Sequence, residues 1–347
     1  MAIISKKKET FPISKYLRSY LRKYDREMDL PVFYADLLRY NNSIPLYDKS
    51  GNDTLWETIF FSQGDMDQIY TSLKKVYAII KADGDLSVMD HLIIDRVDLC
   101  MYGNTRPIRI RVVNQVNDNF DYFYVKNADA SRIYGLELEH LLSPNKLSYV
   151  VNRETIIEEH IVGVPAELFI KKYLTHPNCN EIRLAKEFVK FNERCFVRLL
   201  GDMHSSNFVV DITPDFEDVE YRLRAIDFDQ QSYEGRRAIY LPQYYSQNNP
   251  IINLGLKHMT LETVKQYQRE ERSNIANRMK VEKTRVDDLL DAMRHEKLSK
   301  PENIRKLRKE LAVFYEDKDF LKCKNMGELV SLSLGMLVRK PNLYKDY

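Results

Sequence analysis

Two polar side chains in one short loop have the types and spacing needed for metal-assisted group transfer. Asp202 and Asn207 are five residues apart in the segment Gly201-Asp202-Met203-His204-Ser205-Ser206-Asn207. A carboxylate that orients or deprotonates an attacking hydroxyl must lie near an amide oxygen that holds a phosphate-bound metal. Apolar runs at residues 196–200 and 208–210 flank the loop, so we predict a rigid loop between two strands.

A second acidic motif follows at a suitable distance. Ile226-Asp227-Phe228-Asp229 comes directly after the apolar run at residues 223–226. Asp227 would supply a carboxylate for Mg²⁺, a hard cation that prefers oxygen ligands and polyphosphate. Asp202, Asn207 and Asp227 would then converge on one metal–nucleotide. The alternative interpretation is an ordinary turn in which Asp202 and Asn207 cap backbone groups.

The elements that must position these residues follow from the spacing of apolar side chains. The first ninety residues are expected to be mostly helical, with the clearest helix over residues 66–80. Strands are expected at 91–102, 108–116 and 120–126, a helix at 129–142, and two more strands at 147–151 and 155–161. Gly163-Val164-Pro165 then forms a linker, and the rest is mainly helical apart from residues 196–228.

The two motifs together resemble those of one known family. Gly-Asp-Met-His-Ser-Ser-Asn-Phe with Ile-Asp-Phe-Asp is similar to the aminoglycoside phosphotransferase and choline kinase branch of the protein-kinase-like superfamily. The upstream order of strands also matches the amino-terminal lobe of such kinases. The resemblance implies a two-lobed α+β fold that binds ATP and Mg²⁺. Asp202 would be the catalytic base, Asn207 and Asp227 the metal ligands, and His204 a structural residue of the loop.

The same resemblance implies nucleotide-binding residues upstream. Lys126 ends the third expected strand and would contact the α- and β-phosphates. The family holds this lysine with a glutamate from the next helix; we predict Glu137, which shares a face with the helix's apolar stripe, over Glu139. Residues 156–165 resemble the family's hinge, where adenine would bind main-chain groups near Glu159 and Ile161.

Some positions depart from the family pattern. No Gly-x-Gly-x-x-Gly lies between the first two expected strands, where the turn reads Tyr102-Gly103-Asn104-Thr105-Arg106-Pro107. The contacts of this turn with the nucleotide phosphates would then come from Gly103 and Arg106. Leu200 stands where the family usually has histidine, and the His-Arg-Asp and Ala-Pro-Glu marks of typical protein kinases are absent. These departures favour a small-molecule kinase over an ordinary protein kinase.

Composition narrows the class of protein and its partners. The chain has 347 residues, 44% of them hydrophobic, which is enough for two lobes with substantial cores. A formal charge of +2 gives no reason to expect a nucleic-acid partner. The four cysteines form no C-x-x-C pair, and no stretch reaches the apolar length that spans a bilayer. We therefore expect a cytoplasmic protein with no membrane partner.

These observations predict three regions and one leading function. Residues 1–90 would form a helical extension, 91–162 the kinase-like N-lobe, and 163–347 the C-lobe with its C-terminal helices. The expected activity transfers the γ-phosphoryl group of ATP to a hydroxyl, with a small molecule as acceptor. A nucleotide-binding pseudokinase scaffold and an atypical protein kinase are the alternatives. The basic, apolar-faced helix near residues 15–26 could bind a protein partner, or pack on its own domain.

Overall fold

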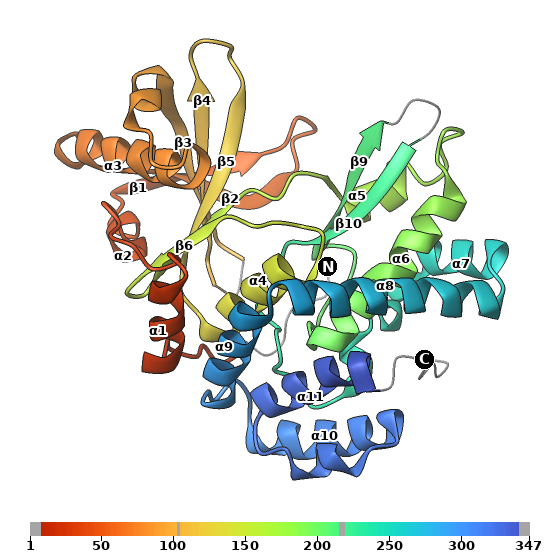
Figure 1. Ribbon diagram of the computed structural model, residues 1–347. Coiled ribbons are helices and arrows are strands. Elements are labelled where there is room, and N and C mark those ends of the chain that lie inside the picture. The colour runs from red at the N-terminus through yellow and green to blue at the C-terminus, as the bar shows by residue number, and fades with distance from the viewer. Residues whose placement is uncertain (1–7, 103–104, 215–218, 340–347) are drawn as a thin grey trace. The chain divides into compact units, whose positions relative to one another are not determined.

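The computed structural model describes residues 8–102, 105–214 and 219–339. The chain is α+β: along the sequence, a seven-stranded antiparallel sheet precedes a mainly helical region (Figure 1). It divides into two compact units. Unit 1 comprises Met1–Asp129 and Leu147–His160, and unit 2 comprises Ala130–Lys146 and Ile161–Tyr347.

The sheet of unit 1 has the strand order β1-β2-β3-β4-β5-β7-β6, and all neighbours are antiparallel. The meander β3–β5 and the hairpin β6–β7 confirm five predicted strands. These strands were predicted because runs rich in Ile, Val, Tyr and Phe alternate with turn residues there. The strands are β1 (Asn42–Tyr47), β2 (Asp53–Phe60), β3 (Leu92–Cys100), β4 (Ile108–Asn114), β5 (Phe120–Asn127), β6 (Tyr149–Asn152) and β7 (Thr155–Glu159).

Strands β1 and β2 lie within the first ninety residues, which were predicted to be mostly helical. They extend the same sheet, so residues 1–90 are not a purely helical extension. Neither strand carries a clear alternation of apolar residues. β1 is the edge strand, is largely exposed and contains Pro45, whereas Leu55 in β2 adopts a positive φ of 62°. A half-buried strand is recognised by its period of two, and that signal is missing here.

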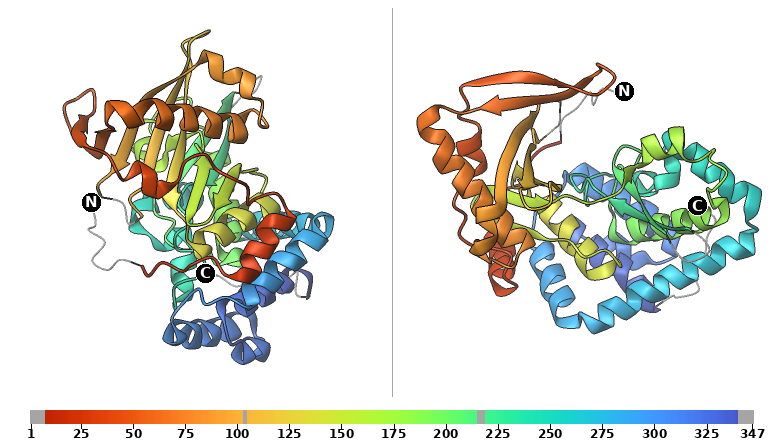
Figure 2. Two further views of the ribbon diagram at one scale, coloured as in Figure 1. Left: turned by 90° about the vertical axis from the view of Figure 1, so that its left-hand side faces the viewer. Right: turned by 90° about the horizontal axis from the view of Figure 1, so that it is seen from above.

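Two helices of unit 1 agree with their predicted patterns. α3 (Gln63–Lys81) crosses one face of the sheet, packs on β3 and β7, and buries Leu73, Val76 and Ile80 (Figure 2). α1 (Lys15–Lys23) buries one apolar face, while Arg18 and Arg22 both pair with Glu27. The basic helix therefore packs on its own unit. The short segments α2 (Tyr34–Leu37) and η1 (Leu86–His91) complete this unit.

Unit 2 is mainly helical and contains a small sheet of order β10-β9-β8. Its strands are β8 (Val164–Pro165), β9 (Phe208–Pro214) and β10 (Val219–Ala225). Its α-helices are α4 (Ala130–Leu142), α5 (Ala166–Lys172), α6 (Glu181–Arg198), α7 (Asn249–His258), α8 (Leu261–Val281), α9 (Lys283–Arg294), α10 (Pro301–Tyr315) and α11 (Met326–Arg339). Short 3₁₀ turns lie at η2 (Arg237–Tyr240), η3 (Pro242–Tyr244), η4 (Ser246–Asn248) and η5 (Lys318–Lys322).

Two predictions differ from the structure in unit 2. Residues 196–198 form the last turn of α6 and not a strand; Leu199 caps the helix in the left-handed region, and Leu200 makes only an isolated bridge to Gln231. A short apolar run cannot by itself distinguish a buried strand from a buried helix end. Helix α4, expected within the N-lobe, belongs to unit 2 because it packs on α8 and α9.

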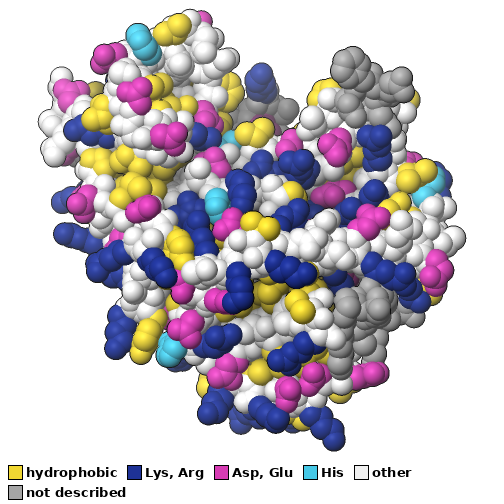
Figure 3. All heavy atoms as spheres, in the orientation of Figure 1, with side chains coloured by type: hydrophobic (Ala, Val, Ile, Leu, Met, Phe, Trp, Pro, Cys, Tyr) yellow, Lys and Arg dark blue, Asp and Glu magenta, His cyan; other side chains and the backbone are white. Residues whose placement is uncertain are grey.

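The surface shows no segregation of charge on the face drawn in Figure 3, where basic and acidic side chains are interspersed. Within the described parts of the chain, no helix has both the length and the apolar character needed to cross a membrane. All four cysteines lie in those parts, and Cys195 and Cys323 are buried.

Candidate functional site

The loop from Gly201 to Asn207 connects the end of α6 to the start of β9 and is tied down by main-chain contacts. The Asp202 N–H donates to the Tyr245 hydroxyl at 3.0 Å and to the Ile239 carbonyl at 3.3 Å. The His204 N–H donates to the Asp202 carbonyl at 2.9 Å. Asp202 itself has a φ of 64°, in the left-handed region that aspartate tolerates better than most residues. The carboxylate is therefore displayed from a fixed backbone.

Asn207 is oriented by the same loop. Its side-chain Nδ2 donates to the Asp202 carbonyl at 2.8 Å and reaches the Asp202 carboxylate at 3.5 Å. Its N–H donates to the His204 carbonyl at 2.8 Å. Because the amide nitrogen is committed to Asp202, the amide oxygen is the atom through which Asn207 would bind a cation.

Pairing between β9 and β10 brings the second motif to this loop. Ala225 pairs with Phe208 at the end of the ladder, and the Ile226 N–H donates to the Asn207 carbonyl at 3.0 Å. Asp227 follows at once, and its Oδ1 accepts the Asp229 N–H at 2.9 Å. Unit 2 thus gathers the three residues predicted from the sequence as catalytic and metal-binding, Asp202, Asn207 and Asp227.

The carboxylate of Asp202 titrates unusually. Burial, and after it the neighbouring carboxylates of Asp227, Glu234 and Asp229, together raise its pKa to about 7. Each of these acids disfavours negative charge on Asp202, so the group is poised to hold a proton near neutral pH. Such a shift, caused by burial and like charge together, is typical of functional carboxylates.

His204 and Glu167 support the loop from its outer side. The His204 ring packs edge-on against the Tyr245 ring, and its Nδ1 accepts the Ser206 N–H at 3.3 Å. Burial lowers the pKa of His204, which favours its neutral form. The Ser206 hydroxyl donates to the Glu167 carboxylate at 3.0 Å. These contacts agree with a structural part for His204.

The predicted lysine and glutamate are each held by a partner in their own unit. Lys126 lies in β5, is buried, and pairs with Glu158 of β7 at 2.8 Å. Glu137 lies in α4, is fully buried, and pairs with Arg285 of α9 at 2.9 Å. Glu139, which the helical spacing placed away from the apolar stripe, is buried as well.

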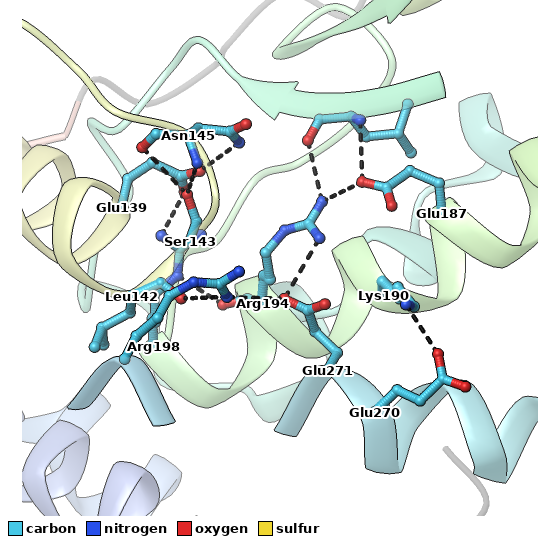
Figure 4. Close-up of polar contacts among 12 residues, drawn as sticks. Glu139, Leu142, Ser143, Asn145, Glu187, Lys190, Arg194, Arg198, Glu270 and Glu271 are labelled. Atoms are coloured by element: carbon cyan, nitrogen blue, oxygen red, sulfur yellow. Dashed lines mark hydrogen bonds and ion pairs between the residues drawn. The ribbon is translucent and has the colours of Figure 1, made fainter. Parts of the chain in front are cut away.

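Glu139 belongs to a buried ionic network that fixes the helices around the loop (Figure 4). It pairs with Arg198 of α6 and accepts the Asn145 amide at 2.9 Å. One turn earlier on α6, Arg194 contacts Glu187 at 2.6 Å and Glu271 of α8 at 3.5 Å. α4, α6 and α8 are thereby joined by paired charges directly before Gly201.

The hinge and phosphate-turn residues have local roles in the structure. Glu159 ends β7, where its carboxylate accepts the Ser148 N–H at 2.8 Å and pairs with Lys81 at 3.3 Å. Ile161 is buried and is the first residue of unit 2 in this part of the chain. In the predicted phosphate turn, Gly103 lies outside the described residues. The Arg106 carbonyl accepts the Tyr34 hydroxyl at 2.9 Å.

Sequence reasoning missed one cation at the site. Arg132, in the first turn of α4, contacts Asp229 at 2.8 Å and Asp227 at 3.1 Å. No role was predicted for Asp229, although it belongs to the motif at residues 226–229. In the sequence, 97 positions separate it from Arg132. An arginine near the start of a helix after a strand gives no sequence signal for such a distant partner.

The donor set fits magnesium better than a transition metal. No group of three or more His, Cys, Asp or Glu side chains arranged to hold a metal occurs among the residues that the structure describes. Asp227, Asp229 and the amide oxygen of Asn207 offer oxygen atoms only. Mg²⁺ keeps several waters and is commonly bound by one or two carboxylates together with substrate phosphates, so a sparse oxygen set is suitable.

Comparison with known proteins adds no relative: no protein-family model matches the chain, and a search of curated proteins finds no significant match.

Proposed function

We propose that the chain is an ATP- and Mg²⁺-dependent kinase that transfers a γ-phosphoryl group to a hydroxyl of a small molecule. The observation that carries the proposal is the hydrogen-bonded arrangement of Asp202, Asn207 and Asp227 at the α6–β9 loop and the end of β10. The resemblance of both motifs to the aminoglycoside phosphotransferase and choline kinase branch supports the same conclusion.

Each residue would have a distinct part in the reaction. Asp202 would orient the acceptor hydroxyl and take its proton as the new oxygen–phosphorus bond forms and the bond to the β-phosphate oxygen breaks, with ADP leaving. Asn207 and Asp227 would hold Mg²⁺, which would offset the negative charge of the phosphates. The raised pKa of Asp202 suits a group that must hold this proton near neutral pH.

Purified protein incubated with Mg-ATP and a panel of hydroxyl-bearing metabolites tests the proposal. Asp202→Ala should lower phosphoryl transfer by about 10²- to 10⁴-fold, the usual contribution of a positioned general base. Asp227→Ala should abolish binding of the metal–nucleotide. Asp211→Ala, which removes the same charge from β9 of the same unit, is the matched control and should retain activity. Equal rates for all three variants would refute the assignment.

A nucleotide-binding pseudokinase is the second candidate, and the Lys126–Glu158 pair favours it. The lysine expected at the phosphates is held at 2.8 Å by a carboxylate of the adjacent strand. Mg-ATP binding without turnover across the metabolite panel would support this candidate. Labelled ATP added to a cell extract separates the remaining alternative, because label appearing in protein would indicate an atypical protein kinase.

A further inference from the structure

The first two turns of α4 dock on the motif that contains Asp227. The Ser131 hydroxyl donates to the Gln231 carbonyl at 2.6 Å. One turn later, a Cβ added to Gly135 would lie 2.9 Å from the Cβ of Phe228, so the helix backbone approaches the motif closely. Ser131 and Gly135 are four residues apart and share one face of the helix. That face is therefore held against residues 226–231.

Arg132 extends from this docked turn to both carboxylates of the motif. Its Nη1 donates to Asp229 Oδ1 at 2.8 Å and to Asp227 Oδ1 at 3.1 Å, while Nη2 reaches the Ile226 carbonyl at 3.5 Å. The Arg132 side chain is only 2% exposed, whereas that of Asp227 is 39% exposed. The guanidinium thus lies behind the carboxylates, and Asp227 faces solvent in front of it.

The geometry points to Arg132 as a positioning residue for the metal–nucleotide: it holds Asp227 through Oδ1 and so fixes the orientation of the carboxylate that would bind the cation. This inference rests on the proposed function and names a residue that neither motif contains. The Asp229 N–H binds the same Oδ1 at 2.9 Å, so two donors fix one oxygen of Asp227. Charge-assisted contacts of this kind set geometry as well as energy.

The charge of Arg132 has a second effect. Asp227 and Asp229 are two residues apart, and without a cation between them their carboxylates would repel each other and any polyphosphate nearby. A guanidinium presents several N–H groups in a rigid plane, so it can serve two carboxylates and a carbonyl at once. A lysine at this position would keep the charge but lose that fork.

Binding of Mn²⁺–ADP, followed by the electron paramagnetic resonance signal of Mn²⁺, tests the inference without requiring turnover. Arg132→Gln should weaken this binding by about tenfold, since one charge-assisted hydrogen bond is comparable to a tenfold change in affinity. Arg132→Lys should fall between Arg132→Gln and the wild type. Where activity is measurable, KM for ATP should rise more than kcat falls.

Arg285→Gln is the matched control. It also removes an arginine that binds a buried acid near α4, but its partner is Glu137 and not the motif. It should lower the melting temperature and leave Mn²⁺–ADP affinity unchanged.

The possible results separate the two claims. No binding by the wild type would overturn the proposed function and this inference with it. Binding by the wild type with equal affinity in Arg132→Gln would overturn the inference alone. If Arg132→Gln does not fold, Arg132→Lys decides: weaker binding than the wild type supports the positioning part, and equal binding refutes it.

Discussion

Two acids of unit 2, Glu139 and Asp202, have their pKa values shifted in opposite directions. At Glu139, burial alone would raise the pKa, but Arg198 and hydrogen bonds from Ser143 and Asn145 lower it below its usual value. At Asp202, burial and three neighbouring carboxylates all raise the pKa, to about 7. The first acid has its counter-charge within the chain. The second has other carboxylates as neighbours, and a pKa raised by burial and like charge together is typical of functional acids.

The largest loss of stability is expected when the ionic network around Glu139 is broken. Arg198→Met would leave Glu139 buried without its counter-ion, and removing one partner of a buried pair costs about 3–5 kcal/mol. Urea unfolding followed by circular dichroism measures this change in the free energy of unfolding. The double variant Glu139→Gln/Arg198→Met should recover much of the loss; failure to recover would show that Arg198 acts through packing.

A smaller loss is expected where α4 meets the metal motif. Gly135→Ala places a methyl group 2.9 Å from the Phe228 Cβ, and such overpacking costs about 1–3 kcal/mol. Gly335→Ala in α11 is the control, because nothing lies within 4 Å of its added Cβ. That substitution should stabilise the protein by about 0.5–1 kcal/mol through helix propensity. Equal effects at both positions would argue against close docking of α4.

If Asp227 and its neighbours bind a metal ion, added Mg²⁺ should stabilise the folded protein. At a Mg²⁺ concentration ten times the dissociation constant, the wild type should gain about 1.4 kcal/mol of stability. Asp227→Asn should gain less, since it loses a ligand carboxylate. Thermal melts with and without Mg²⁺ measure the difference. An identical gain in Arg198→Met would confirm that the ionic network is not the binding region.

A different kind of effect concerns pH. The pKa of Asp202 is higher in the folded state than in an unfolded chain, so folding favours its protonated form. This contribution is present at low pH and is lost as the pH rises through about 7. In metal-free buffer, Asp202→Asn should therefore melt at a higher temperature than the wild type at pH 8, with a smaller difference at pH 5. The reverse order at pH 8 would contradict the raised pKa.

Local patterns were sufficient to predict much of the fold. β3, β4 and β5 are bounded by turn residues, and α3 shows the three-and-four spacing of one buried face. β1 and β2 were missed because neither shows a clear alternation of apolar residues: β1 is an exposed edge strand that contains Pro45, and Leu55 in β2 adopts a positive φ. The end of α6 was mistaken for a strand because its last residues are buried on all sides.

The site was predictable only where spacing along the chain carries the chemistry. Asp202, Asn207 and Asp227 stand in short motifs, and the β9–β10 ladder brings these motifs together. Side chains that meet only through tertiary packing are far apart in the sequence, and no short motif indicates that they pair. Glu158 for Lys126, Arg285 for Glu137 and Arg132 for Asp227 are separated by 32, 148 and 95 positions.

The β9–β10 hairpin has a practical consequence for engineering the chain. Its seven residue pairs run from Phe208 and Ala225 to Pro214 and Val219, and the proposed metal ligands lie just beyond the first pair. Pro214 and Val219 therefore pair at the far end of the ladder from Asn207 and Asp227. A fluorescent or affinity tag inserted between these two residues would label unit 2. It would leave intact the β9–β10 pairing that aligns Asn207 with Asp227.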